Sequence, residues 1–250
     1  MSAITSFILR SLVCLAGALA VTACGSSHGE ERHAQAKPTE TAVPKPRGPV
    51  LVELYQSQGC SSCPPADANV NAIADIPNVI ALSFAVTYWD QLGWKDTYAK
   101  PAFTQRQWDY AHANRRSSVA TPQVWINGRE TIVGNRADQL ASAIDAAHLD
   151  GPALTLQPGK AIVGEARSPV GGADVWLARF DPRTRYVAIN AGENDGRTLP
   201  HRNIVHSLAR IGHWSGAPLQ IALDRIDDGL KDAVFLQSGP GGPILAAARN

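Results

Sequence analysis

The sequence has little surplus charge, no long hydrophobic run and few cysteines. Lysine plus arginine number 23 and aspartate plus glutamate 22, which gives a formal net charge of +1. Nucleic-acid-binding proteins usually carry a strong basic surplus, so the composition argues against nucleic acid as a partner. The apolar run at residues 11–20 is shorter than the roughly 20 residues of a membrane-spanning helix. Hydrophobic residues make up 44% and charged residues 18%, which is typical of a globular protein.

The first 23 residues have the pattern of an export signal. Arg10 precedes the short apolar run, and small residues follow it. The four residues that end at Cys24 (VTAC) resemble a bacterial lipobox, in which cleavage precedes a lipid-modified cysteine. We therefore expect lipidation of Cys24 and an anchor in a bacterial membrane facing the periplasm. By the same resemblance, Gly25 in place of aspartate favours the outer membrane, and an ordinary secretory signal giving a soluble periplasmic protein is the alternative.

This interpretation leaves one pair of thiols in the mature protein. Cys14 lies in the signal and Cys24 would carry lipid, so Cys60 and Cys63 remain. An oxidising compartment allows a disulfide between them to persist.

Hydrophobic patterning divides the rest of the chain into three parts. Residues 24–49 are polar and rich in proline, and we expect a disordered tether. Residues 50–150 predict an α/β domain that opens with a βαβ unit and contains an insert at residues 87–119. Its expected strands are 50–55, 78–86, 121–126 and 130–133, and its expected helices are 60–74, 101–115 and 137–147.

The last hundred residues, 151–250, have a different texture. Short alternating runs are separated by glycine, proline and aspartate, which predicts a β-rich extension. The pattern leaves open whether this part folds alone or extends the first sheet. The runs are 153–156, 161–165, 173–180, 186–189, 204–208, 219–223 and 233–237.

The Cys60-Ser-Ser-Cys63 pair is the strongest chemical signal in the chain. Two cysteines at the start of a helix can form an accessible disulfide, and the helix N-terminus favours thiolate over thiol. Cys60 is therefore the predicted nucleophile, and Cys63 the residue that resolves a mixed disulfide. We expect no cofactor.

Thr121-Pro122 is the second part of the predicted catalytic site. In thioredoxin-like folds a cis-proline at the start of the third strand faces the CxxC pair. Such a bond is accessible mainly to proline, and it leaves the backbone of the preceding residue free to pair with a substrate. Pro122 is thus predicted to shape the docking edge, with Thr121 contacting the substrate backbone.

Metal binding and a permanently closed disulfide are the alternatives for this pair. A structural zinc site needs four ligands, and only one CxxC pair is present, so we predict no metal. A copper site would need a nearby histidine, for which His112 is the candidate. A closed disulfide would stabilise little, because the loop that it closes is very short.

Four sets of motifs resemble domain-of-unknown-function family 1223. That family is assigned to the thioredoxin-like superfamily, and its members look exported. The resemblance implies a thioredoxin-like domain with a helical insert and a β-rich C-terminal extension, but it carries no activity or substrate. The motifs are residues 53–67 (ELYQSQGCSSCPPAD); 88–96 (YWDQLGWKD); 121–123, 127–128 and 133–134; and 192–197 with 201–203.

The second motif supplies the candidate substrate-binding residues. It follows a strand, and the carboxyl ends of strands line the binding crevice of an α/β sheet, so it should lie near Cys60. Tyr88, Trp89 and Trp94 could form a recognition platform, and Asp90 could influence proton traffic. The alternative is that these aromatics pack the insert onto the domain.

The late motif at residues 192–203 admits two interpretations. Its dense polar residues could line a binding surface, or they could form a hydrogen-bonded loop that docks the extension. Taken together, the sequence predicts a cell-envelope thiol–disulfide oxidoreductase whose partners are protein thiols or disulfides. The alternatives are a noncatalytic scaffold with a fixed disulfide and a copper-handling protein.

Overall fold

The computed structural model describes residues 48–224 and 229–250. The predicted signal peptide, the lipidation site Cys24 and nearly all of the predicted tether lie outside the described residues. Among the described residues, no helix is long and apolar enough to cross a membrane.

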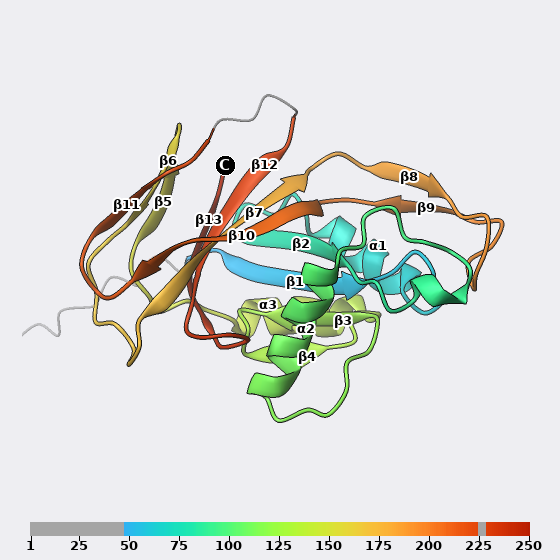
Figure 1. Cartoon of the computed structure of the whole chain (residues 1–250), viewed down its shortest axis with the longest axis horizontal. Coiled ribbons are helices and arrows are strands. Elements are labelled where there is room, and N and C mark those ends of the chain that lie inside the picture. The colour runs from blue at the N-terminus through green and yellow to red at the C-terminus, as the bar shows by residue number, and fades with distance from the viewer. Residues whose placement is uncertain (1–47, 225–228) are drawn as a thin grey trace, which may run out of the picture. The chain divides into compact units, whose positions relative to one another are not determined.

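The first half of the described chain alternates strands and helices, as the hydrophobic pattern predicts (Figure 1). A short 3-10 helix, η1, lies in the insert. The elements are β1 (Val50–Gln56), α1 (Pro64–Ala72), β2 (Val79–Ala85), η1 (Asp90–Leu92), α2 (Pro101–Ala113), β3 (Gln123–Ile126), β4 (Glu130–Ile132) and α3 (Ala137–Ala146).

The second half consists of strands, in agreement with the predicted β-rich extension. Its elements are β5 (Leu154–Gln157), β6 (Lys160–Val163), β7 (Ala173–Asp181), β8 (Arg185–Ala188), β9 (Thr198–His201), β10 (Ile204–Trp214), β11 (Leu219–Ala222), β12 (Lys231–Gln237) and β13 (Ile244–Arg249).

Both halves contribute to one mixed sheet of eight strands in the order β13-β12-β7-β10-β2-β1-β3-β4. β1 and β2 are parallel and are joined through α1, whereas β3 is antiparallel to β1 and to β4. β10 lies beside β2 in parallel, with Ile204 opposite Ser83. The extension therefore continues the sheet of the first half, and the fold is mixed α/β.

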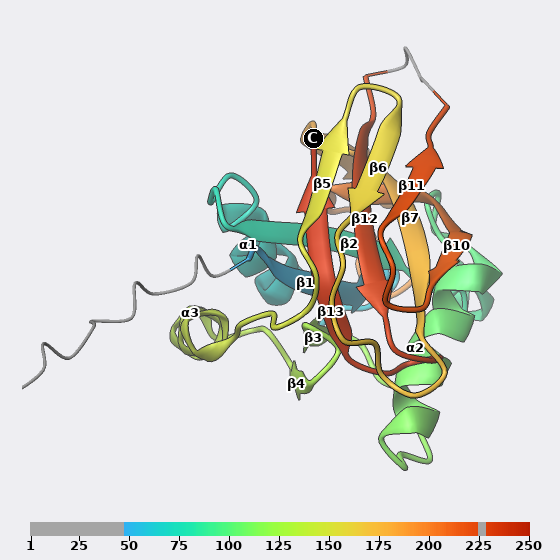
Figure 2. The same ribbon diagram turned by 90° about the vertical axis from the view of Figure 1, so that its left-hand side faces the viewer.

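Alternating side chains of β1 feed two separate cores. Val52 and Leu54 pack with α1 and α3, while Leu51 and Tyr55 pack with aromatic residues on the side of α2. Figure 2 shows α1 and α3 on one side of the sheet and α2 on the other. A strand covered on both faces is apolar at nearly every position, which explains the run at Val50–Gln56.

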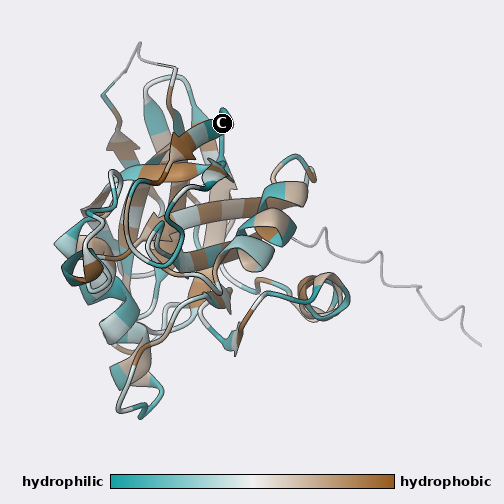
Figure 3. Cartoon of the chain, turned by 90° about the vertical axis from the view of Figure 1, so that its right-hand side faces the viewer, coloured by the Kyte–Doolittle hydropathy of each residue, from teal (hydrophilic) through white to brown (hydrophobic). Residues whose placement is uncertain are grey.

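Two smaller sheets complete the extension. β11, β6 and β5 form a three-stranded sheet that packs on the β7 and β12 end of the large sheet. β8 and β9 form a two-stranded arm, which reaches the side of α1 (Figure 1). Figure 3 shows that hydrophobic residues concentrate along the strands of the large sheet, in agreement with a core on both of its faces.

Two strands were not predicted from the sequence. β9 contains Pro200, and β13 has the alanine-rich sequence ILAAAR. Proline and alanine are depleted in strands, so neither segment has a strong local signal. The Asn127-Gly128 turn between β3 and β4 was predicted, and both residues have positive φ.

Candidate functional site

The cysteine pair lies in a loop between β1 and α1. Residues 57–63, here called the CxxC loop, contain a disulfide between Cys60 and Cys63 with a Cα–Cα distance of 5.5 Å. The helix begins at Pro64, so the prediction of a helix from Cys60 was wrong by one turn. A helix from Cys60 would need Pro64 and Pro65 to donate backbone N–H groups, which proline lacks.

Both cysteines are buried, although the sequence predicted an accessible disulfide. Cys60 and Cys63 are each 0% exposed, whereas Ser61 and Ser62 between them are exposed. The Ser62 hydroxyl lies 3.3 Å from Cys60 Sγ. A protein partner therefore meets the two serines before it meets the sulfurs.

Thr121 and Pro122 lie beside this pair, as predicted. The Thr121–Pro122 peptide bond is cis. The Thr121 carbonyl accepts a hydrogen bond from the Ser62 hydroxyl at 3.4 Å, and its side-chain hydroxyl accepts one from Trp89 Nε1 at 2.7 Å. The start of β3 and the CxxC loop are thus in direct contact.

The aromatic motif also contacts the CxxC loop. Trp94 Nε1 donates to Gln58 Oε1 at 2.9 Å, and Trp89 bonds Thr121, so both tryptophans border the site. Tyr88 donates its hydroxyl to Gln107 Oε1 at 3.3 Å, and this hydroxyl also interacts with the Thr121 side chain. Burial raises the pKa of the Tyr88 hydroxyl to about 12, so this phenol stays protonated.

Two carboxylates of the same motif organise its backbone. Asp90 accepts a hydrogen bond from the Asp96 amide at 3.1 Å. Asp96 is buried and accepts from the amides of Gln58 at 2.7 Å and Tyr98 at 2.9 Å, so it caps a turn and also holds the loop. Burial raises the pKa of Asp96, while the amide hydrogen bonds act against that shift.

The late motif docks on the loop from the β8–β9 arm. Residues 192–197 form a turn, here called the 192–197 turn. Asn194 is fully buried and donates to the carbonyls of Gln58 at 2.8 Å and Cys60 at 2.9 Å. Glu193 accepts from the Ser61 amide at 3.0 Å and the Ser61 hydroxyl at 2.7 Å. These contacts confirm the docking interpretation of this motif.

A buried acid and a buried histidine lie next to one another behind the loop. Asp67 on α1 and His201 on β9 are 5% and 1% exposed. His201 Nδ1 lies 4.0 Å from Asp67 Oδ1, which is too long for a hydrogen bond. Burial raises the pKa of Asp67 well above its usual value, with a further contribution from Asp96. Burial also lowers the pKa of His201 to about 4, so this imidazole is neutral at pH 7.

Sequence reasoning missed a buried ion pair on the other face of the sheet. Arg106 Nε on α2 lies 2.7 Å from Glu53 Oε1 on β1, and both side chains are almost fully buried. Arg106 also donates to Gln237 on β12 and to Tyr110, whose hydroxyl in turn bonds Glu53. The available signal was the single charge at Glu53 within an otherwise apolar run.

The structure does not support the copper-handling alternative with a set of metal ligands among the described residues. His112 lies near the end of α2 and packs its ring 5.4 Å from that of Trp108. In the described part of the chain, no three histidine, cysteine, aspartate or glutamate side chains form a group that could hold a metal ion.

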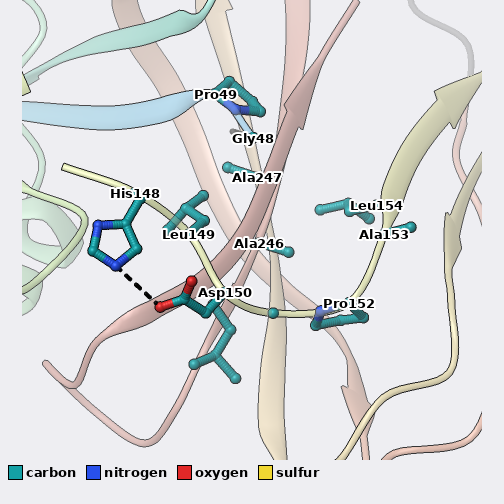
Figure 4. Close-up of a pocket in the computed structure, with 12 residues that line it drawn as sticks. Gly48, Pro49, His148, Leu149, Asp150, Pro152, Ala153, Leu154, Ala246 and Ala247 are labelled. Carbon is teal, nitrogen blue, oxygen red and sulfur yellow. Dashed lines mark ion pairs between the residues drawn. The ribbon is translucent and has the colours of Figure 1, made fainter. Parts of the chain in front are cut away.

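A cavity of about 650 Å³ lies apart from the cysteine pair (Figure 4). Its lining is mainly glycine, alanine, proline and leucine from the start of β1, the segment before β5, and β13. Its polar feature is the exposed pair His148 and Asp150, whose side chains are 3.2 Å apart. None of the predicted site residues lines it, so the candidate site is the CxxC loop with its neighbours.

Two solved structures are similar to this chain in fold. Protein AGR_C_4864 from Agrobacterium tumefaciens, a solved structural-genomics target, is similar with a TM-score of 0.69 and 28% identity, over 82% of this chain and 95% of that one. HBP35 of Porphyromonas gingivalis is similar in fold alone, with a TM-score of 0.50 and 11% identity, over 82% of this chain and 75% of that one. A search of curated proteins finds no match. Residues 51–237 match the family described as "Protein of unknown function (DUF1223)", and the chain belongs to that family.

Proposed function

We propose that this protein is a thioredoxin-like thiol–disulfide oxidoreductase of the bacterial cell envelope. The observation that carries the proposal is the disulfide-bonded Cys60–Cys63 pair just before α1, where Ser62 between the cysteines bonds the carbonyl of Thr121, two residues before β3. The strand order β2-β1-β3-β4, with β1 and β2 parallel and β3 antiparallel, supports the thioredoxin-like assignment.

The chemistry is an exchange of two electrons between the cysteine pair and a protein partner. In the reducing direction, the Cys60 thiolate attacks one sulfur of a substrate disulfide. A Cys60–substrate bond forms, and the other substrate sulfur leaves as a thiolate. The Cys63 thiolate then attacks Cys60 Sγ, the intramolecular disulfide forms and the second substrate thiolate leaves. The substrate is reduced by two electrons, and the pair is oxidised by two. With a substrate dithiol the same steps run in reverse.

Several parts of the site support this role. Cys63 precedes the first turn of α1, where the partial positive charge of a helix N-terminus favours the thiolate form of nearby cysteines. Trp89 and Trp94 border the loop and offer apolar surface to a polypeptide. Thr121, Pro122, Tyr88 and Asp90 complete the proposed binding side.

The proposed location follows from the N-terminal sequence. A lipid on Cys24 would tether the domain to a membrane, on the periplasmic side, where protein thiols and disulfides are the available partners. Soluble periplasmic export is the alternative, and the exchange chemistry is the same in either case.

The burial of both cysteines favours a second candidate function. With 0% of each residue exposed, the disulfide could be a fixed part of a noncatalytic scaffold. The two functions differ in one requirement, since exchange needs the loop to open locally and a scaffold does not.

Disulfide reduction in vitro tests the proposal. The domain from residue 48 onward, reduced beforehand, should reduce the interchain disulfides of insulin, and Cys60→Ser should abolish this activity. Ser142→Ala, on α3 away from the loop, is the matched control and should retain full activity. A Cys60→Ser variant as active as the wild type would overturn the proposal.

A further inference from the structure

We propose that Glu193 is a positioning residue whose negative charge opposes formation of the Cys60 thiolate and so lowers the reduction potential of the Cys60–Cys63 pair. This inference rests on the proposed function for its biological meaning. Its physical content concerns only the equilibrium between the disulfide and the dithiol.

The position of Glu193 is fixed by the rest of its turn. Asn194 donates to the carbonyls of Gln58 and Cys60, and Arg197 donates to Asn194 Oδ1 at 2.7 Å. The neighbouring Glu193 carboxylate consequently meets Ser61, with both contacts made by Oε2. These hydrogen bonds hold the 192–197 turn against the CxxC loop, although the two segments are more than 130 residues apart in the chain.

The Glu193 carboxylate is ionised and bonds to Ser61, the residue that follows Cys60 in the chain. Its hydrogen bonds with the hydroxyl and the amide of Ser61 lower the pKa of Glu193. The Ser61 amide belongs to the turn between the two cysteines. A free N–H group in this turn would stabilise a negative charge on the Cys60 sulfur. Glu193 occupies this donor and adds a negative charge of its own.

The titratable groups around the CxxC loop come from four segments: α1, the aromatic motif, the segment before β3 and the 192–197 turn. On α1, burial favours the neutral form of Asp67. The charged residues of the other segments are Asp90, Lys95 and Asp96 in the motif; Arg115 and Arg116 before β3; and Glu193, Asp195 and Arg197 in the turn. His201 on β9 faces Asp67 and is neutral, because burial lowers its pKa to about 4. Among these groups, Glu193 is the carboxylate bonded between the two cysteines.

The sign of the effect follows from electrostatics. Reduction creates a thiolate at Cys60, and a like charge nearby disfavours it, whereas the disulfide is neutral and unaffected. The carboxylate therefore favours the disulfide over the dithiol. Removing the charge should make the dithiol easier to form and its Cys60 more reactive.

The test compares Glu193→Gln with the wild type and with Glu165→Gln. Glutamine keeps an oxygen that can accept from Ser61 but has no charge, and Glu165 is an exposed carboxylate in the segment after β6. Two quantities are measured in the domain from residue 48 onward: the equilibrium constant with glutathione, and the pH midpoint of Cys60 alkylation by iodoacetamide in a Cys63→Ala background.

We expect Glu193→Gln to shift the glutathione equilibrium about threefold toward the dithiol, which is about 15 mV in reduction potential. The alkylation midpoint should fall, and both shifts should shrink in 1 M salt, which screens an exposed charge. Glu165→Gln should match the wild type. Unchanged values in Glu193→Gln, or equal shifts in both variants, would overturn the inference. Because neither measurement needs a protein substrate, its failure is distinct from failure of the proposed activity.

Discussion

At the scale of single residues, the buried pair Glu53 and Arg106 should matter most for stability. The guanidinium of Arg106 also stacks over the rings of Trp176 and Phe235, at 5.6 and 4.9 Å from their centroids. Arg106→Met should lower the free energy of unfolding by about 3–5 kcal/mol, because it leaves the Glu53 charge buried without its partner. Urea denaturation monitored by tryptophan fluorescence measures this change.

A double variant provides the control for that prediction. Replacing both charges, as Glu53→Leu with Arg106→Met, should recover most of the lost stability, because no unpaired charge remains buried. A double variant that is less stable than Arg106→Met alone would contradict the assignment of the loss to an unpaired charge.

His201 makes stability depend on pH in a defined window. Burial lowers its pKa to about 4 in the folded protein, below the roughly 6.5 of an exposed histidine. The unfolded chain therefore binds the proton first, and the contribution of His201 to stability should fall by about 3 kcal/mol as the pH drops from 6.5 to 4.

The comparison with His201→Gln isolates this contribution. Asp67 acts in the opposite sense, because burial raises its pKa and its neutral form is favoured at low pH. The difference in unfolding free energy between wild type and His201→Gln should therefore narrow or reverse between pH 6.5 and 4. A constant difference across that range would contradict a neutral, buried His201.

At the scale of elements, the β8–β9 arm should control access to the disulfide. Asn194→Ala removes two hydrogen bonds that hold the CxxC loop. At about 1 kcal/mol of net stabilisation for each bond, or about 2 kcal/mol for both, local opening should become roughly thirtyfold easier and reduction by dithiothreitol correspondingly faster.

Asn71→Ala is the matched control for the arm. Asn71 on α1 donates to the Pro200 carbonyl on β9 but does not touch the CxxC loop. This variant should be reduced at nearly the rate of the wild type. Equal acceleration in both variants would mean that general loosening of the arm, rather than the Asn194 contacts, governs reduction.

Elements with a strong local pattern could be predicted from the sequence. The apolar run of β1 and the Asn127-Gly128 turn each have a distinctive signal, and the structure has both. β9 and β13 have no such signal, and each is stabilised by pairing with the strand that precedes it, β8 and β12. The start of α1 was predicted one turn too early. Pro64 and Pro65 lack N–H groups, so they fit the first turn of the helix and the residues before them stay in the loop.

Within the site, contacts that follow from a known fold pattern were easier to predict than pairings of single polar residues. Thr121 beside the cysteine pair was expected from the likeness to thioredoxin-like folds, and the aromatic motif near the loop from its place after a strand. The bonds from Glu193 to Ser61 and from Arg106 to Glu53 join positions far apart in the chain. No spacing rule in a single sequence indicates which distant polar residues meet.

At the scale of the whole molecule, the two halves should unfold together. One core cluster contains Phe84 and Phe103 from the first half with Phe180 and Phe235 from the second. Calorimetry of the domain from residue 48 onward should therefore show one transition. A chain ending at residue 150 should show no cooperative transition, because the β2 edge and half of that core would be exposed. Two separate transitions in the longer chain would contradict this prediction.

Trapping of mixed disulfides in the native cell envelope tests the central claim most directly. A full-length Cys63→Ala variant cannot resolve an intermediate, so Cys60 should accumulate covalent adducts with envelope proteins that disappear on treatment with dithiothreitol. A variant that carries both Cys60→Ser and Cys63→Ala should form none. Absence of adducts in Cys63→Ala, with the protein exported and folded, would contradict the oxidoreductase and favour the scaffold with a fixed disulfide.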